Sequence, residues 1–203
     1  MYLPKQFDRP EHAGTLMREH PLASLVTTDD SGFPFITHLP LKLEEEGGAP
    51  RRLLGHCARG NPLWGYLQRR PLALASFMGP QAYMSPKVYA DLQRVPTWCY
   101  LAVQVRVQAK LLEGEAAKDA LLKQLIGDHE PPYAAQWRAL PEDYTERMLQ
   151  GIVAFELDVV DLQCAVKLNQ HRPEAHAAMH QAYTAGGHQE QALAQWMQRL
   201  GMV

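Results

Sequence analysis

Hydrophobic and polar residues alternate along parts of this chain in the pattern of half-buried β-strands. From Leu101 to Leu111 every second residue is apolar, and most residues between them are Gln, Arg or Lys. A period of two places all the apolar side chains on one face of a strand. The same alternation from Val153 to Val159 predicts a last long strand. Both segments indicate a sheet with one buried face.

Shorter apolar and β-branched runs predict more strands earlier in the chain. Residues 22–28 and 33–43 flank the turn-forming sequence Asp-Asp-Ser-Gly at 29–32, so together they predict a β-hairpin. Further extended segments are expected at residues 51–57, 71–77 and 81–85. Gly79-Pro80 is expected to break the chain between the last two. The order of the segments predicts six or seven mostly antiparallel strands.

Helices are predicted between these strands and at the end of the chain. They are expected over about residues 10–20, 62–70 and 115–126, and from residues 141 and 174 onward. The second helix should begin at Asn61-Pro62, because Asn is a favoured N-cap and Pro a favoured first helical residue. Gly186-Gly187 should divide the last one. Because no regular strand-helix-strand rhythm is present, the pattern predicts a mostly β fold with α decorations, a small closed or split β-barrel.

Composition narrows the class of protein. The 203 residues are 46% hydrophobic and 21% charged, which fits one large globular domain and excludes collagen, coiled-coil and low-complexity chains. The formal net charge of -2 gives no overall positive field of the kind that drives nucleic-acid binding. No apolar run approaches the ~20 residues that cross a bilayer, and the start lacks the form of a secretory signal. We expect a cytoplasmic chain with reduced thiols and no membrane partner.

The sequence GHCARGNP at residues 55–62 is the first candidate for chemistry. This sequence places Arg59 directly before a helix start that is capped by Asn61. A guanidinium, free backbone N–H groups and the positive end of a helix dipole then converge, and such a place suits a phosphate. The alternative from the residues alone is a capped helix with an arginine on its surface.

Two other segments have side chains suited to a ligand. Aromatic residues among Pro, Ser and Thr at residues 76–86 and 95–100 suit stacking on a planar ligand or, alternatively, capping of a barrel end or a subunit interface. The segment after the last strand suits an anion clamp or, alternatively, a solvated surface. Its basic and amide side chains are Lys167, Gln170, His171 and Arg172.

Familiar catalytic and metal motifs are absent from the sequence, among them GxGxxG, Walker A, HExxH, GxSxG and paired zinc cysteines. His176 and His180 lie four apart on a predicted helix, with His171 and His188 nearby, but no third metal ligand is placed with them. We therefore assign no metal site and no catalytic acid or base. Cys57 and Cys99 are interpreted as small core residues.

Several blocks of this sequence occur together in the order known from one family. They are MYLPKQF at the start, TxxxGxPxxTHLP at 28–40, GHxARxNP at 55–62, FxGPxAYxSP at 77–86, VPTWxY at 95–100, and GIVAFEL followed by KLxQxR at 151–172. With these blocks the chain resembles the PaiB-like family over about residues 1–175. Several blocks in order are far more specific than any one of them.

The resemblance implies an FMN-binding split β-barrel that forms a homodimer with the ligand cleft between subunits. It also implies a negative transcriptional regulator, for which DNA is a partner. FMN is the implied cofactor, and its isoalloxazine would do any redox chemistry. In this flavin hypothesis Arg59 and Asn61 hold the phosphate. Ser85, Thr97 and Trp98 flank the ring or ribityl chain. Lys167, Gln170 and Arg172 approach from the other side of the cleft.

Two rival functions share the expected fold. One is a flavin-dependent oxidoreductase of the pyridoxamine-phosphate-oxidase type. The other is a haem-binding split barrel, in which the histidine-rich tail supplies an axial ligand. The extent of the resemblance predicts a domain over residues 1–175 and a helical tail over 176–203, whose part beyond Gly186 is expected to be dispensable for folding.

Overall fold

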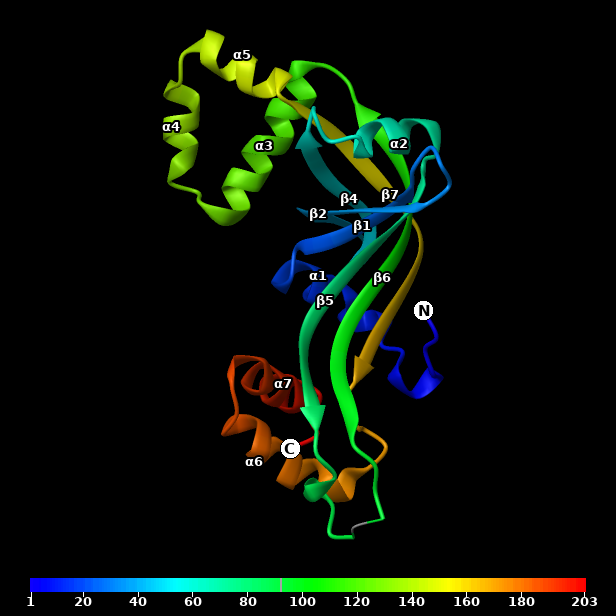
Figure 1. Cartoon of the computed structure of the whole chain (residues 1–203). Coiled ribbons are helices and arrows are strands. Elements are labelled where there is room, and N and C mark those ends of the chain that lie inside the picture. The colour runs from blue at the N-terminus through cyan, green and yellow to red at the C-terminus, as the bar shows by residue number, and fades with distance from the viewer. Residues whose placement is uncertain (92) are drawn as a thin grey trace. The chain divides into compact units, whose positions relative to one another are not determined.

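Seven β-strands form one sheet in the computed structural model, which describes residues 1–91 and 93–203 (Figure 1). The strands are β1 (Leu22–Thr28), β2 (Pro34–Pro40), β3 (Lys42–Glu46), β4 (Ala49–Ala58), β5 (Leu72–Met84), β6 (Thr97–Leu112) and β7 (Ile152–Lys167). Their order in the sheet is β2-β1-β5-β6-β7-β4-β3. The pairs β1–β2, β1–β5, β3–β4 and β4–β7 are antiparallel. The predicted mostly β fold is confirmed.

Helices precede, interrupt and follow the strands. The α-helices are α1 (Ala13–Glu19), α2 (Leu63–Arg69), α3 (Glu115–His129), α4 (Tyr133–Ala139), α5 (Glu142–Gln150), α6 (His176–Thr184) and α7 (His188–Arg199). The short 3-10 helices are η1 (Lys5–Phe7), η2 (Pro10–His12), η3 (Pro86–Val88) and η4 (Pro173–Ala175). None of the helices in the described part of the chain is long and apolar enough to span a bilayer. The division of the tail at Gly186-Gly187 is confirmed.

The described chain divides into two compact units. Unit 1 comprises Met1–His20, Met78–Gln104 and Gln163–Val203, and unit 2 comprises Pro21–Phe77 and Val105–Leu162. The strands β5, β6 and β7 each contribute one part to each unit. Each unit has buried apolar residues of its own.

The predicted hairpin opens unit 2. Strands β1 and β2 pair from Leu22 opposite Pro40 to Thr28 opposite Pro34. Asp29 organises the turn, because its Oδ1 accepts hydrogen bonds from the hydroxyl and amide of Ser31 and from the amide of Phe33. These donors lower the pKa of the exposed Asp29 carboxyl, the Ser31 hydroxyl most of all.

The segment 33–43, expected to be one strand, is two. Strand β2 ends at Pro40, and β3 begins at Lys42. Between them lies the buried Leu41, whose amide donates to the carbonyl of Pro21 instead of to a strand partner. The following strand, β3, pairs with β4 and no longer with β1. The continuous apolar pattern of residues 33–43 therefore gives no sign that the paired strand changes from β1 to β4.

The sheet of unit 2 curls toward closure. Strands β2 and β4 contact each other although they lie near opposite ends of the strand order. Gly55 of β4 permits this approach: a Cβ at this position would come within 3.2 Å of a Leu39 methyl carbon on β2 and 2.6 Å of one on Leu41. A side chain here would hold the two strands apart, so glycine is required by the closure itself.

The expected break at Gly79-Pro80 is wrong, because β5 continues through both residues to Met84. Gly79 does not make a turn. It lies in unit 1 against β6, where a Cβ would come within 3.2 Å of the Leu101 carbonyl oxygen. The pairing of β5 with β1 ends at Phe77, so Pro80 lies beyond that pairing, in a stretch where proline is better tolerated than in a central strand.

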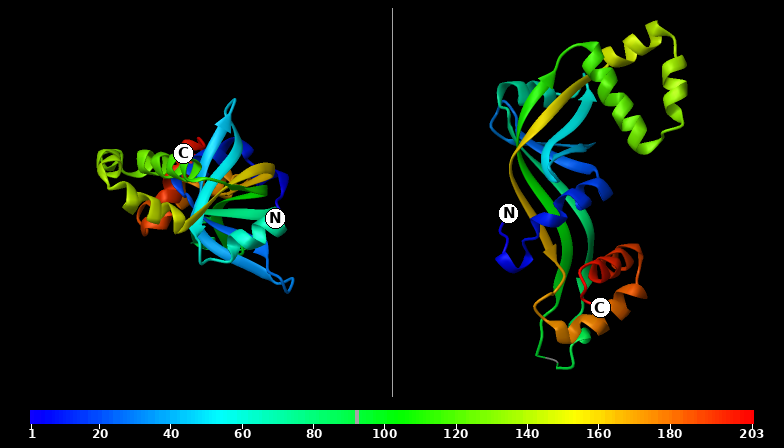
Figure 2. Two further views of the ribbon diagram at one scale, coloured as in Figure 1. Left: turned by 90° about the horizontal axis from the view of Figure 1, so that it is seen from above. Right: turned by 180° about the vertical axis from the view of Figure 1, so that it is seen from behind.

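The helices between β6 and β7 belong to unit 2 and follow one another around an open arch (Figures 1 and 2). Helix α3 contacts both α4 and α5. Its Leu121 is buried against Leu54 and Ala154 of the sheet. Helices α3 and α5 occur where expected. Helix α4 was not predicted.

The tail helices α6 and α7 lie side by side in unit 1 in every view (Figures 1 and 2). Helix α7 buries Leu193, Trp196 and Met197. The Trp196 ring meets the His12 ring edge-on at 5.5 Å. Arg199 donates to a Glu19 carboxylate oxygen at 2.6 Å. The tail is therefore part of the packed core of unit 1, while the domain boundary at residue 175 stays a prediction.

Candidate functional site

The eight residues predicted to bind FMN are distributed over both units. Arg59 and Asn61 belong to unit 2. The other six belong to unit 1: Ser85, Thr97, Trp98, Lys167, Gln170 and Arg172. Different elements build the two groups.

Arg59 follows the last residue of β4 and precedes α2, as the sequence predicts. Its Nε donates to the carbonyl of Gln150 at 2.7 Å and its Nη2 to the carbonyl of Ile152 at 3.4 Å. A guanidinium has five N–H donors, so three remain for a ligand. The exposed arginine is thus anchored at the junction of α5 and β7 and still able to bind an anion.

Asn61 acts at the start of α2 as predicted. Its Oδ1 accepts a hydrogen bond from the Leu63 amide at 3.0 Å, which satisfies one of the amides that a helix start leaves without a partner. The Trp64 indole donates to the Arg59 carbonyl at 2.9 Å. Together these bonds fix the loop from β4 to α2 and hold the backbone that carries Arg59.

A buried lysine that the sequence analysis did not single out lies close to Arg59. Lys118 of α3 is only 8% exposed, and its Nζ donates to the Leu149 carbonyl at 2.9 Å. Burial lowers its pKa, and the positive charge of Arg59 lowers it further. Within residues 1–91 and 93–203 no carboxylate lies at ion-pair distance from it. The signal was present in the sequence, because Lys118 precedes Leu121 and Leu122 by three and four residues on the apolar stripe of the helix.

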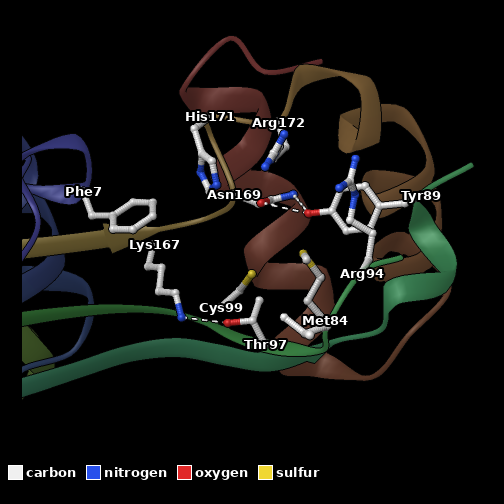
Figure 3. Close-up of a pocket in the computed structure, with 11 residues that line it drawn as sticks. Phe7, Met84, Tyr89, Arg94, Thr97, Cys99, Lys167, Asn169, His171 and Arg172 are labelled. Atoms are coloured by element: carbon white, nitrogen blue, oxygen red, sulfur yellow. Dashed lines mark hydrogen bonds between the residues drawn. The ribbon is translucent and has the colours of Figure 1, made fainter. Parts of the chain in front are cut away.

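Unit 1 contains a cavity of about 220 Å³ (Figure 3). Its walls come from η1, the end of β5, the loop after η3, the start of β6, and the end of β7 with the loop that follows. The lining residues are Phe7, Met84, Tyr89, Arg94, Val95, Thr97, Cys99, Lys167, Asn169, His171 and Arg172. Three of the predicted ligands thus meet here, namely Thr97, Lys167 and Arg172.

The charged side chains of this cavity are all basic. Lys167 reaches toward β6 and donates to the Thr97 hydroxyl at 2.8 Å (Figure 3). Its Nζ also lies 5.8 Å from the centre of the Tyr100 ring. Arg172 has only a long contact of 3.9 Å with Glu174. Arg94 pairs with Asp91 at 2.8 Å, so among the described lining residues Lys167 is the cation that has no carboxylate at ion-pair distance.

A reciprocal side-chain pair holds the far wall of the cavity. The Tyr89 hydroxyl donates to Asn169 Oδ1 at 3.1 Å, and Asn169 Nδ2 lies 2.9 Å from the same hydroxyl (Figure 3). Asn169 has a φ of 63°, a left-handed conformation that asparagine tolerates better than most residues. Its carbonyl lies 3.2 Å from the ring nitrogen of the buried His176. The loop after β7 is therefore fixed from both sides.

The other three predicted ligands of unit 1 make local hydrogen bonds. Ser85 accepts from the Lys87 amide at the start of η3. The Trp98 indole donates to Gln81 at 2.9 Å. Both ends of the Gln170 amide bond to nearby backbone groups. These side chains support the loops around the cavity, and their role toward a flavin stays a prediction.

The cysteines are small core residues, as expected. Cys57 and Cys99 are buried, and burial raises the pKa of both thiols. Cys164 is also buried, which raises its pKa to about 12. Cys99 thus offers the cavity a neutral, weakly polar wall. Among the described residues no cluster of three or more His, Cys, Asp or Glu side chains is placed to hold a metal ion.

Comparison with known proteins identifies the family. Residues 1–161 match the family model described as "Putative FMN-binding domain". The protein named "Protease synthase and sporulation protein PAI 2" from Bacillus subtilis (strain 168) is 35% identical over 179 residues, which are 86% of this chain and 84% of that protein. The chain belongs to the PaiB-like FMN-binding family. The blocks that suggested this family therefore identified it correctly.

Solved structures confirm the fold of this PaiB-like chain. The flavocytochrome Anf3 from Azotobacter vinelandii matches with a TM-score of 0.62 at 16% identity, covering 81% of this chain and 71% of that one. The FAD and heme binding protein from Mycobacterium smegmatis matches with a TM-score of 0.59 at 18% identity, covering 78% and 71%. At such identities the likeness concerns the fold alone, an FMN-binding-like split barrel with helices.

Proposed function

We propose that this chain is an FMN-binding protein of the PaiB-like type, that it acts as a homodimer, and that it has the regulatory role implied by the family resemblance. The observation that best supports FMN binding lies in unit 2. Arg59 keeps three donors for a ligand beside a fixed helix start. No carboxylate among the described residues lies at ion-pair distance from the buried Lys118 nearby, and Glu115 raises the pKa of Lys118 less than burial and Arg59 lower it. Two cations without a full counter-charge suit the phosphate of FMN.

The residues present therefore fit the cofactor of the family. Arg59 would bind the phosphate directly, while Asn61 holds the loop in place and Lys118 adds positive charge from below the surface. When bound, FMN supplies the redox chemistry of its isoalloxazine ring. The six residues of unit 1 form the second part of the proposed ligand set.

The absorption spectrum of the freshly purified protein tests the flavin proposal. We expect the visible bands of an oxidised flavin, and release of FMN when the protein is denatured. A haem spectrum would favour the rival haem-binding function instead. A colourless protein that also fails to quench the fluorescence of added FMN would contradict the proposal.

The regulatory part rests on the family resemblance. With a net charge of -2 the chain has no overall positive field, so any contact with DNA would need a local basic patch. The cavity of unit 1 also fits a second candidate, a flavin-dependent oxidoreductase, because such an enzyme binds a substrate beside its flavin. Turnover of NAD(P)H by the flavin-loaded protein distinguishes the two functions.

The homodimer is supported by an apolar row across the outer face of the sheet in unit 2. Ile36 and Leu74 lie opposite Val26 from either side, on β2, β1 and β5. Ile36 is 53% exposed, and the neighbouring Leu72 is 70% exposed. Adjacent exposed apolar residues of this kind mark an interaction surface, and a second copy of the chain can cover it symmetrically.

We expect a dimer at micromolar concentration in light scattering, and a shift toward monomer in the Ile36→Glu variant, because a carboxylate in an apolar interface is costly. Phe33→Glu is the matched control, since Phe33 is exposed at the hairpin turn, outside the row. A wild-type chain that runs only as monomer, or equal effects of the two substitutions, would exclude this interface.

A further inference from the structure

A second cavity lies in unit 2, where the helices α3 and α4 meet the strands β2 and β4. Its volume is about 420 Å³, within the roughly 300 to 1,000 Å³ of most small-molecule sites. We call this cavity the helix pocket, and its walls include Pro40, His56, Leu122, Ile126, Tyr133 and Trp137. All its lining residues belong to unit 2, and none of them belongs to the proposed FMN ligand set.

The apolar stripe of α3 is wider than the sheet beneath it covers. Leu121 is buried in a core cluster with residues of the sheet, and Leu125 packs against the same cluster one turn later. Leu122 and Ile126 form the neighbouring line of the helix, and both stay half-buried in the wall of the helix pocket. Because further burial of such side chains is favourable, they present a surface that an apolar ligand can cover.

Helix α4 adds two aromatic side chains to the wall. Tyr133 and Trp137 lie four residues apart and therefore on one face of the helix, and both are half-buried. The Trp137 indole donates to an Asp119 carboxylate oxygen at 2.9 Å. On α3, Asp128 forms an ion pair with Lys42 of β3. These bonds hold the walls in place without a ligand, and such preorganisation lowers the entropy cost of binding.

A polar side chain of the helix pocket has no partner in the described part of the chain. His56 of β4 lines the pocket, and neither of its ring nitrogens forms a hydrogen bond within residues 1–91 and 93–203. Burial lowers the pKa of His56, so at pH 7 the ring is neutral and has one N–H donor and one acceptor nitrogen. A ligand with a hydrogen-bonding group would supply the missing partner.

The charges of the lining disfavour an anion. Glu130 is the acidic side chain of the helix pocket, and the described lining residues include no lysine or arginine. An anion would meet a carboxylate, and the apolar walls would remove it from water at a large cost. The helix pocket therefore suits a neutral molecule.

We propose that the helix pocket binds a neutral aromatic molecule with a hydrogen-bonding group, and that the His56 ring bonds to this group. Aromatic rings suit the pocket because Tyr133 and Trp137 can pack against them edge-on or offset. The inference goes beyond FMN binding, since it concerns a second ligand in a pocket that contains none of the proposed flavin ligands. It holds whether or not the chain binds FMN.

Titration with two fluorescent probes, with and without added FMN, tests the inference. N-phenyl-1-naphthylamine is neutral and has one N–H group, whereas 8-anilino-1-naphthalenesulfonate is the same skeleton with a negative charge. In the pocket variants, Ile126→Glu introduces a carboxylate, Leu122→Trp fills the space and His56→Leu removes the hydrogen bond. Gln124→Glu is the matched control, because it adds a charge at an exposed position of α3 that does not line the pocket.

We expect the wild-type chain to bind one molecule of the neutral probe. Ile126→Glu and Leu122→Trp should weaken this binding about tenfold or more. His56→Leu should weaken it roughly twofold to tenfold, which corresponds to one hydrogen bond, and Gln124→Glu should leave it unchanged. Neither of the first two variants should remove any binding of the sulfonate probe. Melting temperatures establish that each variant is folded, and Leu122→Trp provides the test if Ile126→Glu does not fold.

The inference is wrong if the wild-type chain does not bind the neutral probe, or if the folded pocket variants bind it as tightly as the wild type does. An unchanged affinity in His56→Leu alone would overturn the role given to His56. Displacement of the probe by FMN would make the pocket part of the flavin site and would also overturn the inference. Probe binding by a chain that fails to bind FMN would instead contradict the proposed function and support this inference.

Discussion

Replacing Arg59 with alanine is expected to weaken FMN binding roughly tenfold to a hundredfold and to leave riboflavin binding almost unchanged. A charge-assisted hydrogen bond contributes about 1.5 to 3 kcal/mol, and riboflavin has no phosphate with which to form one. Titration of flavin fluorescence with both ligands measures the difference. Arg138→Ala, on the exposed surface of α4, is the matched control.

Arg59 also has a structural role, because it donates to two carbonyls where α5 gives way to β7. We therefore expect the substitution to lower the free energy of unfolding by about 1 kcal/mol, the net contribution of an ordinary hydrogen bond. If FMN and riboflavin lost affinity equally, the arginine would shape the site through this junction and would not bind the phosphate.

Ending the chain after Ala185 is expected to abolish soluble, folded protein. The truncation removes α7, which buries Leu193, Trp196 and Met197. Each large side chain contributes about 1.5 to 3 kcal/mol on burial, so their sum is comparable with the roughly 5 to 15 kcal/mol that stabilises a whole domain. The earlier expectation that this helix is dispensable is replaced by the opposite one. Soluble yield and thermal melting measure the effect.

A shorter truncation provides the control for this experiment. Ending the chain after Met202 removes only Val203, which is exposed, and should leave the melting temperature unchanged. A folded chain ending at Ala185 with an unchanged melting temperature would show that the packing of α7 adds little to the stability of unit 1.

Local patterns in the sequence predicted the local structure well. The alternation from Leu101 to Leu111 predicted which residues of β6 are buried, because successive side chains of a strand point to opposite faces of the sheet. The hairpin turn at Asp29 and the helix start at Asn61 followed from side chains that bond to their own backbone neighbours. Such bonds depend on a few adjacent residues, so spacing alone reveals them.

Features that depend on distant partners were missed. Gly79 was interpreted as a break between two strands, whereas the glycine is needed because β6 approaches β5 closely at this position. The burial of Lys118 depends on the elements packed around α3. Arg94 lines the same cavity as Lys167, although the two residues are more than seventy positions apart in the printed sequence. No contiguous pattern contains that information.

The walls of the cavity in unit 1 come from three stretches of chain, represented by Phe7, Met84 and Lys167. The contacts between them span large sequence separations, and such contacts form late when a chain folds because their loops are costly to close. The cavity thus exists only after both ends of the chain have met around β5 and β6. A ligand bound there would stabilise, by mass action, all three stretches as one cooperative element.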